Sequence, residues 1–203
     1  MDVTTAMLTR RSEHDLLDPA PDDNEFTYLL KVAAAAPDHG LLHPWRWVLV
    51  RGDDRDALGA CFAEDVREER RARAVAKVQR APLLASLVFA PVRGHKVPQW
   101  EQLAATSAMT HALMLLLHSR GFGSIWRTGA LVHSPQARRL LDLADGEELL
   151  GWLYIGTPDP SAPRRRRELY DVSGRLTKLS ALTRASSPAR SRSGASADCP
   201  TGM

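Results

Sequence analysis

The sequence predicts an α+β domain in which a mixed β-sheet is packed between helices. Three short segments rich in aromatic and β-branched residues have the composition of strands, and longer stretches of helical composition separate them. These helical stretches occur in pairs rather than alternating one for one with the strands, which favours an α+β arrangement. At 203 residues, 44% hydrophobic and 25% charged, the chain is long enough for one domain with a substantial core.

Turn and capping residues mark the ends of these segments. The strands are predicted at residues 45–52, 82–92 and 149–156. Asp22 and Glu25 have the spacing of a capping box at the start of a helix, which Pro37 then stops. Another helix is predicted to begin at Ser134, with Pro135 in its first turn.

Two longer helical segments predict different environments. Residues 54–80 mix acidic and basic side chains, so we expect a solvated helix face with local ion pairs that each contribute little. Residues 101–120, which end at Gly121, carry Leu, Met and Ala around most of the helix circumference. A helix of that kind belongs in a large core or at an obligate dimer interface.

Charge and cysteine content restrict the classes of function. The formal net charge is +3, but residues 184–203 hold three Arg and one Asp and so carry two of the excess charges. A nearly neutral body argues against a broad nucleic-acid-binding face. No apolar run is long enough to span a bilayer, and the N-terminal sequence is not that of a secretory signal. Because only Cys61 and Cys199 occur, we expect no disulfide framework and a cytoplasmic location.

The C-terminal region differs in composition from the rest of the chain. Residues 184–203 contain one apolar side chain larger than Ala or Cys, that of Met203. Such a segment cannot bury enough surface to offset the entropy lost on ordering. We therefore expect one folded, ligand-binding domain over residues 1–175 and a disordered Ser/Arg-rich tail over residues 176–203.

Arg10, Arg11 and Ser12 form the first cluster with recognisable chemistry. They lie at the end of a short amphipathic N-terminal helix. Two guanidinium groups beside a hydroxyl suit a phosphate monoester, which accepts charge-assisted hydrogen bonds. The alternative is that the arginines only complement the dipole at the end of the helix.

The second cluster is the irregular loop at residues 36–46, which lies between a helix and a strand and carries two His, one Asp and one Arg. Loops held between rigid elements commonly bind ligands. His39 and His43 are four residues apart, but Pro37 and Pro44 disfavour a helix between them, and no Cys or third His lies nearby. No metal site is therefore expected. The alternative is that the histidines cap turns.

The third cluster is the glycine-rich segment at residues 121–129, GFGSIWRTG, which is predicted to be a loop after the buried helix. Its glycines let a planar ligand approach the backbone closely. Trp126 could pack near an aromatic ring system, and Arg127 could contact an anion or a carbonyl-rich ring edge. The same glycines also suit a tight turn. No complete set of protein catalytic groups accompanies these clusters, so we expect a cofactor to supply the chemistry.

In their order along the chain, these pieces resemble the nitroreductase superfamily, in particular its small bacterial NAD(P)H nitroreductases. The resemblance runs from Met1 to Pro158. It rests on Arg10-Arg11-Ser12, APDH at 36–39, HPWRW at 43–47, HKVPQWEQ at 95–102, GFGSIWRTGAL at 121–131 and GWLYIGTP at 151–158. It implies a nitroreductase-like fold that binds FMN and forms an obligate homodimer, with two active sites at the subunit interface.

The resemblance also assigns cofactor-binding positions residue by residue. Arg10, Arg11 and Ser12 match positions at the phosphate end of FMN, and His39 matches a position that reaches FMN from its loop, into the partner's site. Trp126, Arg127 and Thr128 match the second flavin segment, and Arg166 is a further phosphate ligand, with a solvated basic patch as the alternative.

One departure from the family concerns His43, where members commonly carry Gln or Asn before Pro-Trp. An imidazole can still form a hydrogen bond there, but its charge near neutral pH could alter the potential of the flavin. His95, Lys96 and Trp100 are candidates for the substrate side, with a structural role as the alternative.

The activity implied by the resemblance is a ping-pong reaction. NAD(P)H reduces bound FMN by hydride transfer, leaves, and is replaced by an electrophilic small-molecule acceptor such as a nitroaromatic or a quinone. No side chain need act as a nucleophile. Two other classes remain open: a flavin-binding sensor or storage protein without turnover, and, least favoured, a nucleic-acid-associated protein that uses the arginines at 164–167 and the tail.

Overall fold

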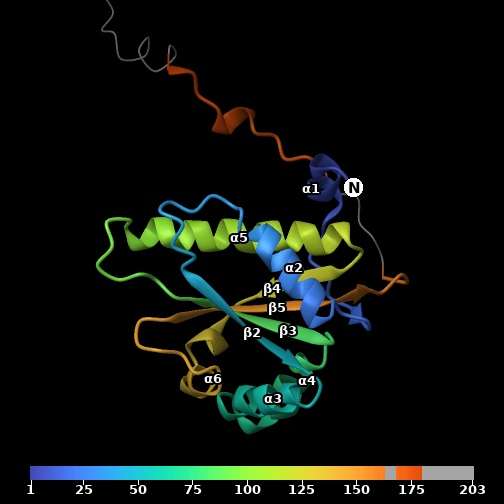
Figure 1. Ribbon diagram of the computed structural model, residues 1–203. Coiled ribbons are helices and arrows are strands. Elements are labelled where there is room, and N and C mark those ends of the chain that lie inside the picture. The colour runs from blue at the N-terminus through green and yellow to red at the C-terminus, as the bar shows by residue number, and fades with distance from the viewer. Residues whose placement is uncertain (163–167, 180–203) are drawn as a thin grey trace, which may run out of the picture. The chain divides into compact units, whose positions relative to one another are not determined.

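A five-stranded sheet separates two layers of helices in the computed structural model (Figure 1). The structure describes residues 1–162 and 168–179. Arg166 and residues 180–203, most of the predicted tail, lie outside the described residues. The chain divides into two units, Met1–Arg165 and Arg166–Met203, and the described part of the second contains one short 3-10 helix, Ser173–Arg175.

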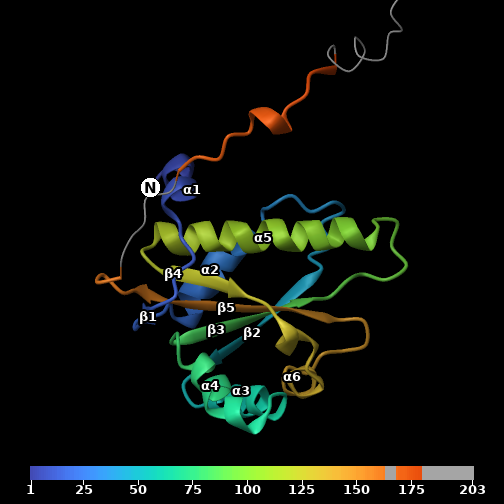
Figure 2. The same cartoon turned by 180° about the vertical axis from the view of Figure 1, so that it is seen from behind.

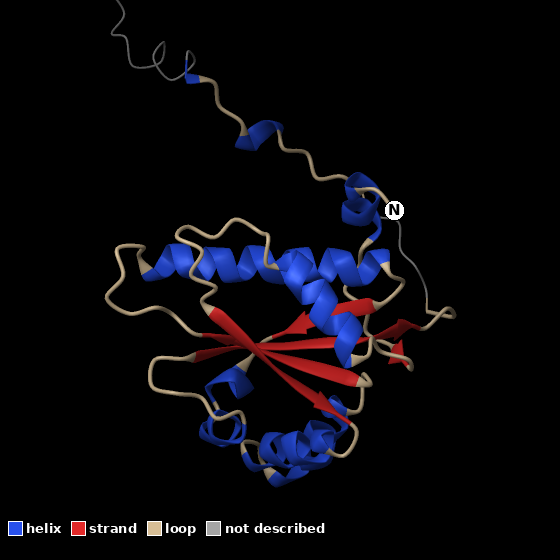
Figure 3. Ribbon diagram, viewed as in Figure 1, coloured by secondary structure: helices blue, strands red, loops and turns tan. Residues whose placement is uncertain are grey.

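The first unit contains all the strands and the α-helices of the described chain. In chain order its elements are α1 (Val3–Thr9), β1 (Leu16–Leu17), α2 (Asp23–Ala33), β2 (Trp45–Arg51), α3 (Asp54–Glu64), α4 (Glu68–Val78), β3 (Leu83–Phe89), α5 (Gln99–Ser119), β4 (Gly123–Arg127), the 3-10 helix η1 (Ala130–His133), α6 (Pro135–Leu140) and β5 (Glu148–Pro158). Helices α2 and α5 cover one face of the sheet, and α3, α4 and α6 cover the other (Figure 3). This confirms the predicted α+β class.

Strand β5 lies at the centre of the sheet. It pairs with β3 along one edge, and β2 pairs with β3 beyond it. Along its other edge β5 pairs with β4, and near its C-terminal end it also pairs with β1 (Figure 2). All of these strand pairs are antiparallel. The sheet therefore differs from the mixed sheet that the sequence predicted, and the parallel contact between Ser12 and Ser124 is an isolated bridge outside the strands.

Alternating side chains of the central strands build two separate cores. In β3, Leu83, Ala85 and Leu87 pack beneath α2 and α5, whereas Leu84 and Val88 face α3, α4 and α6. The period of two along a strand thus supplies apolar surface to both helical layers. The predicted strands at 82–92 and 149–156 fit this pattern, since both central strands are buried on two faces.

The helix starts predicted from the sequence are confirmed. The Asp22 carboxylate accepts a hydrogen bond from the Glu25 N–H at 2.8 Å, and Ser134 Oγ accepts one from the Ala137 N–H at 3.0 Å. Both caps satisfy a backbone donor that the first turn leaves unpaired. The helical segment predicted at 54–80 forms two helices, and Gly59 of α3 lets Val78 of α4 approach closely.

The segment predicted to be a glycine-rich loop at 121–129 differs most from expectation, because Gly123–Arg127 forms strand β4. The prediction of a loop was wrong since it gave weight to the glycines and not to partner strands. A side chain at Gly123 would lie 2.8 Å from a methyl carbon of Leu16 and 2.9 Å from Pro158. Here glycine provides room for neighbouring strands, which sequence-local turn signals cannot reveal.

Gly151 of β5 has the same function beside the end of β4. Its φ is +123°, and a Cβ at this position would lie 2.3 Å from the carbonyl oxygen of Arg127. We predict that Gly151→Ala lowers the free energy of unfolding by at least about 2 kcal/mol, because it adds backbone strain to a collision with backbone. Urea unfolding measures this. The control is Gly94→Ala, at φ +69° with nothing within 4 Å, which should cost only about 1 kcal/mol. Equal costs for the two variants would contradict the close approach at Gly151.

Candidate functional site

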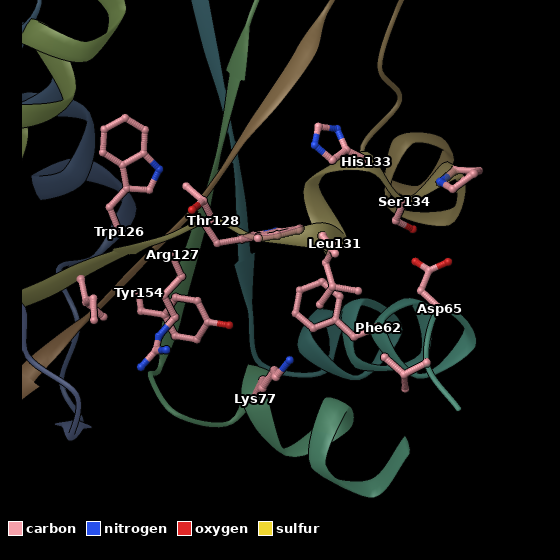
Figure 4. A pocket seen from close by; sticks show the side chains of 16 residues that line it. Phe62, Asp65, Lys77, Trp126, Arg127, Thr128, Leu131, His133, Ser134 and Tyr154 are labelled. Atoms are coloured by element: carbon pink, nitrogen blue, oxygen red, sulfur yellow. The ribbon is translucent and has the colours of Figure 1, made fainter. Parts of the chain in front are cut away.

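A cavity of about 650 Å³ lies where β4 ends, on the face of the sheet covered by α3, α4 and α6. A volume of this size is typical of sites for small molecules and cofactors. Figure 4 shows side chains converging on it from β4, β5, η1 and the helices α3 and α4. Its lining comprises Phe62, Asp65, Val66, Lys77, Ile125, Trp126, Arg127, Thr128, Gly129, Ala130, Leu131, His133, Ser134, Pro135, Trp152 and Tyr154.

The end of β4 places Trp126 and Arg127 on opposite sides of the strand (Figure 4). The Trp126 indole N–H donates to the carbonyl of Leu150 at 3.1 Å, and its ring joins the core beneath α5. The Arg127 guanidinium lies over the ring of Tyr154, 5.4 Å from the ring centroid. The predicted residues Trp126, Arg127 and Thr128 therefore do lie together at one cavity.

Arg127 is a cation in this site with an unused hydrogen-bond donor. Its Nε is buried and has no hydrogen-bond partner among the described residues, while Nη2 donates to Nδ1 of His14 at 3.1 Å. A buried N–H of a charged group that lacks an acceptor is costly, and a ligand oxygen would remove that cost. Burial raises the pKa of Tyr154, which favours its neutral phenol, and the charges of Arg127 and Arg80 oppose that shift.

A second unsatisfied donor lies in the cavity lining. Trp152 is 2% exposed, and its indole N–H has no hydrogen-bond partner among the described residues. Phe62 packs edge-on against it, with ring centroids 4.8 Å apart. The cavity thus combines aromatic walls with N–H groups that have no acceptor among the described residues. This arrangement fits a planar ring that bears oxygen and nitrogen acceptors.

The N-terminal cluster lies beside β4. Ser12 forms the parallel bridge to Ser124, the Glu13 N–H donates to the Ser124 carbonyl at 3.2 Å, and His14 then reaches Arg127. The segment that follows Arg10 and Arg11 therefore runs along the strand that leads to the cavity. His14 was not among the predicted site residues, because no motif marks it.

Arg10 and Arg11 lie at the end of α1. Arg11 Nη1 donates to the carbonyls of Leu8 at 2.6 Å and Arg10 at 3.0 Å, which satisfies acceptors that the helix end leaves unpaired. Arg10 is half-buried at the C-cap. Neither residue lines the cavity. The Arg11 side chain has the helix-end role that was the alternative for this pair, and phosphate binding stays a prediction.

His39 is placed away from the lining of the cavity. Its Nδ1 lies 2.7 Å from Oε2 of Glu101 in the first turn of α5, and its side chain is 65% exposed. His43 has a φ of +45°, and its N–H donates to the Asp38 carboxylate at 2.7 Å. Within residues 1–162 and 168–179, no three His, Cys, Asp or Glu side chains gather as metal ligands would.

The candidate substrate-side residues His95, Lys96 and Trp100 do not line the cavity either. His95 Nδ1 accepts a hydrogen bond from the Val97 N–H at 3.2 Å, and Trp100 is 70% exposed on α5. By contrast, Phe62, Asp65 and Lys77 do line the cavity, although the sequence indicated only a solvated helical segment there.

An ion pair fixes the wall that η1 and α6 contribute. Arg46 of β2 donates to both carboxylate oxygens of Glu147, at 2.8 and 2.7 Å, and also to the carbonyls of Leu141 and Asp142. This ties the connection between α6 and β5 to the far strand of the sheet. The hydrogen bonds from Arg46 hold the pKa of Glu147 below its usual range, despite the opposing effect of burial.

The Glu147 pair predicts how stability changes with pH. Since the pKa of Glu147 is lowered on folding, the pair stabilises above the unfolded pKa of 4.5, and this contribution is lost as pH falls through the folded value. We predict that Glu147→Gln costs about 1–2 kcal/mol at neutral pH, and that its difference from the wild type vanishes in acid. Denaturant unfolding at several pH values measures this. The exposed neighbour change Glu148→Gln should be neutral, and a Glu147→Gln cost that is independent of pH would contradict the assignment.

Comparisons with known proteins agree with this fold. The model of the family described as "Nitroreductase family" matches residues 7–157. The Escherichia coli (strain K12) protein named "Putative NAD(P)H nitroreductase YdjA" is 32% identical over 167 residues, which cover 80% of this chain and 91% of that protein. A Haemophilus influenzae protein with the name of an NAD(P)H nitroreductase is 29% identical over 88% of this chain and 100% of its own length.

Solved structures show the same fold. A nitroreductase-like family protein from Bacillus cereus has a TM-score of 0.78 at 24% identity, covering 88% of this chain and 96% of that one. The FMN and NADPH-dependent nitroreductase NfnB from sphigopyxis sp. strain HMH has a TM-score of 0.70 at 20% identity. This likeness covers 88% of this chain and 99% of that one.

The chain belongs to the nitroreductase family, as its resemblance predicted. It is accordingly an oxidoreductase enzyme. In the described part of the chain, no helix has both the length and the apolar character that a membrane crossing requires.

Proposed function

We propose that the chain binds FMN in the cavity at the end of β4 and catalyses reduction of nitroaromatic, quinone or similar electrophilic acceptors by NAD(P)H in a ping-pong reaction. The observation that carries this is the unsatisfied Nε of Arg127 inside an aromatic-walled cavity of about 650 Å³. The names of the relatives support it, since two include NAD(P)H nitroreductase and one solved neighbour is FMN and NADPH-dependent. We place the reaction in the cytoplasm.

The residues present fit FMN in their chemistry. An isoalloxazine ring is flat and carries carbonyl and nitrogen acceptors along one edge, which suits the donors of Arg127 and Trp152 and the aromatic ring of Phe62. When bound, FMN supplies the chemistry of accepting a hydride from a nicotinamide and passing reducing equivalents to an acceptor. The protein then has to bind, orient and stabilise charge.

Each part of the site has a separate role in this proposal. Arg127 and Lys77 place positive charge at the cavity, where they stabilise the negative charge that accumulates on reduction. Trp126 and Thr128 fix the end of β4 against the ring. Arg10, Arg11, Ser12 and, outside the described residues, Arg166 are proposed to bind the phosphate, as the family resemblance assigns them.

The flavin test begins with the visible spectrum of the purified protein. We predict an FMN spectrum that bleaches when NADPH or NADH is added without oxygen and returns when a quinone or a nitroaromatic is added. Arg127→Met should retain the fold by circular dichroism, bind FMN at least about tenfold more weakly and lower the potential of the residual flavin, because a charge-assisted bond is removed.

Arg139→Met is the matched control, since Arg139 is an exposed α6 arginine that does not line the cavity. A colourless protein that takes up no added FMN would refute the proposal. A flavin that bleaches without any acceptor restoring its colour would favour a sensor or storage protein.

We further propose that the functional unit is a homodimer built on α5. The outer side of this helix presents apolar and small side chains at helical spacing, including Trp100 at 70% and Leu103 at 39% exposure, followed by Ala104, Ser107 and His111. Exposed apolar surface of this kind along a long helix is typical of subunit contacts. The exposed His39 beside Glu101, at the start of α5, would then lie close to the second subunit.

Introduction of a charge on the outer side of α5 tests the dimer. We expect the wild-type chain, of 22.4 kDa, to have twice that mass in light scattering. Leu103→Glu should raise the dimer dissociation constant at least about tenfold, because the interface would bury an unpaired charge. Leu140→Glu on α6 is the control, since Leu140 is similarly exposed at 44%. An unchanged dimer in Leu103→Glu would exclude this face.

A further inference from the structure

Helix α4 carries three cations that form no ion pair with the described residues. Arg70, Arg73 and Lys77 recur at helical spacing and so share one side of the helix. The sequence predicted local ion pairs along residues 54–80. Among the described residues, α4 contains one such pair, Arg71 with Glu68 at 2.5 Å. Neither Arg70, Arg73 nor Lys77 forms an ion pair with any residue in the described part of the chain.

These three cations line a hollow that adjoins the cavity. The hollow has a volume of about 390 Å³, and Val66 and Ala74 complete its lining. Two residues, Val66 and Lys77, line both the hollow and the cavity at the end of β4. In Figure 4 the Lys77 side chain points from α4 toward the cavity. A ligand in the cavity can therefore extend past Lys77 onto α4.

The local charge is much higher than that of the rest of the chain. Residues 67–80 contain six basic and two acidic side chains, an excess of four, whereas the whole chain has a net charge of +3. Cationic side chains around a concave surface focus a positive potential and attract anions. Two guanidinium groups in one hollow can each bind a phosphate through paired hydrogen bonds.

We propose that this hollow binds the 2′-phosphate of NADPH and makes NADPH the preferred electron donor. The inference rests on the proposed function, since the nicotinamide ring of the donor must then reach the cavity. Arg70 and Lys77 are seven positions apart, which corresponds to roughly 10 Å of helix and lies within the reach of an extended dinucleotide. NADH lacks the phosphate dianion at this position, so it leaves Arg70 and Arg73 unpaired.

The hollow suits a single phosphate group better than a nucleic-acid backbone. Three cations gathered in one concave site recognise one anion, whereas a nucleic acid requires a broad basic face on the protein. The phosphate of FMN is assigned to the N-terminal arginines, which do not line this hollow. The anion that remains for this hollow is therefore the 2′-phosphate of the electron donor, NADPH.

Binding of the oxidised dinucleotides tests the inference without turnover. Titration calorimetry of the FMN-bound protein with NADP⁺ and NAD⁺ should show NADP⁺ bound at least about tenfold more tightly. In the double variant Arg70→Gln, Arg73→Gln, we expect NADP⁺ affinity to fall to that of NAD⁺, while NAD⁺ affinity and FMN content stay unchanged. The matched control Arg71→Gln, on the same helix but outside the hollow, should keep the wild-type preference.

Two results would overturn the inference: equal binding of NADP⁺ and NAD⁺ by the wild type, or equal weakening of both in the double variant. The preference should also shrink as salt is added, because exposed charges are screened. A protein that binds no FMN yet still prefers NADP⁺ would refute the proposed function and leave the phosphate site standing. A wild-type protein that holds reducible FMN but binds NADP⁺ and NAD⁺ equally would overturn the phosphate site and leave the proposed function standing.

Discussion

Backbone pairing on both edges of β5 is the constraint on which the rest of the molecule depends. This strand joins β3 on one side to β4 on the other and also pairs with β1, so it connects parts of the sheet that come from different regions of the chain. A strand in the middle of a sheet satisfies its backbone N–H and C=O groups by pairing with its neighbours. The register between β4 and β5 therefore sets where the last residue of β4 lies. The position of Arg127, and with it the cavity, follows from that register.

Short-range features were predictable because the physics behind them is local. The Asp22 and Ser134 caps, the three strands and the apolar α5 each follow from residues within one turn or one strand of each other. The grouping of Trp126, Arg127 and Thr128 followed from their adjacency. The family resemblance supplied the rest of the expected site, including Arg10, Arg11, Ser12 and His39.

Other features depend on pairings far apart in sequence. Strand β4 looked like a loop because Gly123 was taken as a turn residue, whereas it makes room for Leu16 and Pro158, which are distant along the chain. Phe62, Lys77 and Tyr154 come from three elements, and no spacing relates them. His14 meets Arg127 only because Ser12 bridges to Ser124. Side chains of this kind become visible once the sheet register is known.

The position of β2 in the sheet has a consequence for how the chain behaves in a concentrated solution. Among the described residues β2 pairs with β3 alone, so one line of its backbone groups is open to another chain. Two arginines, Arg46 and Arg51, stand near its ends, each held in place by an acidic residue, Glu147 and Asp23. Charged side chains fixed on an edge strand oppose the addition of a further strand, and so they protect the molecule from growing into aggregates.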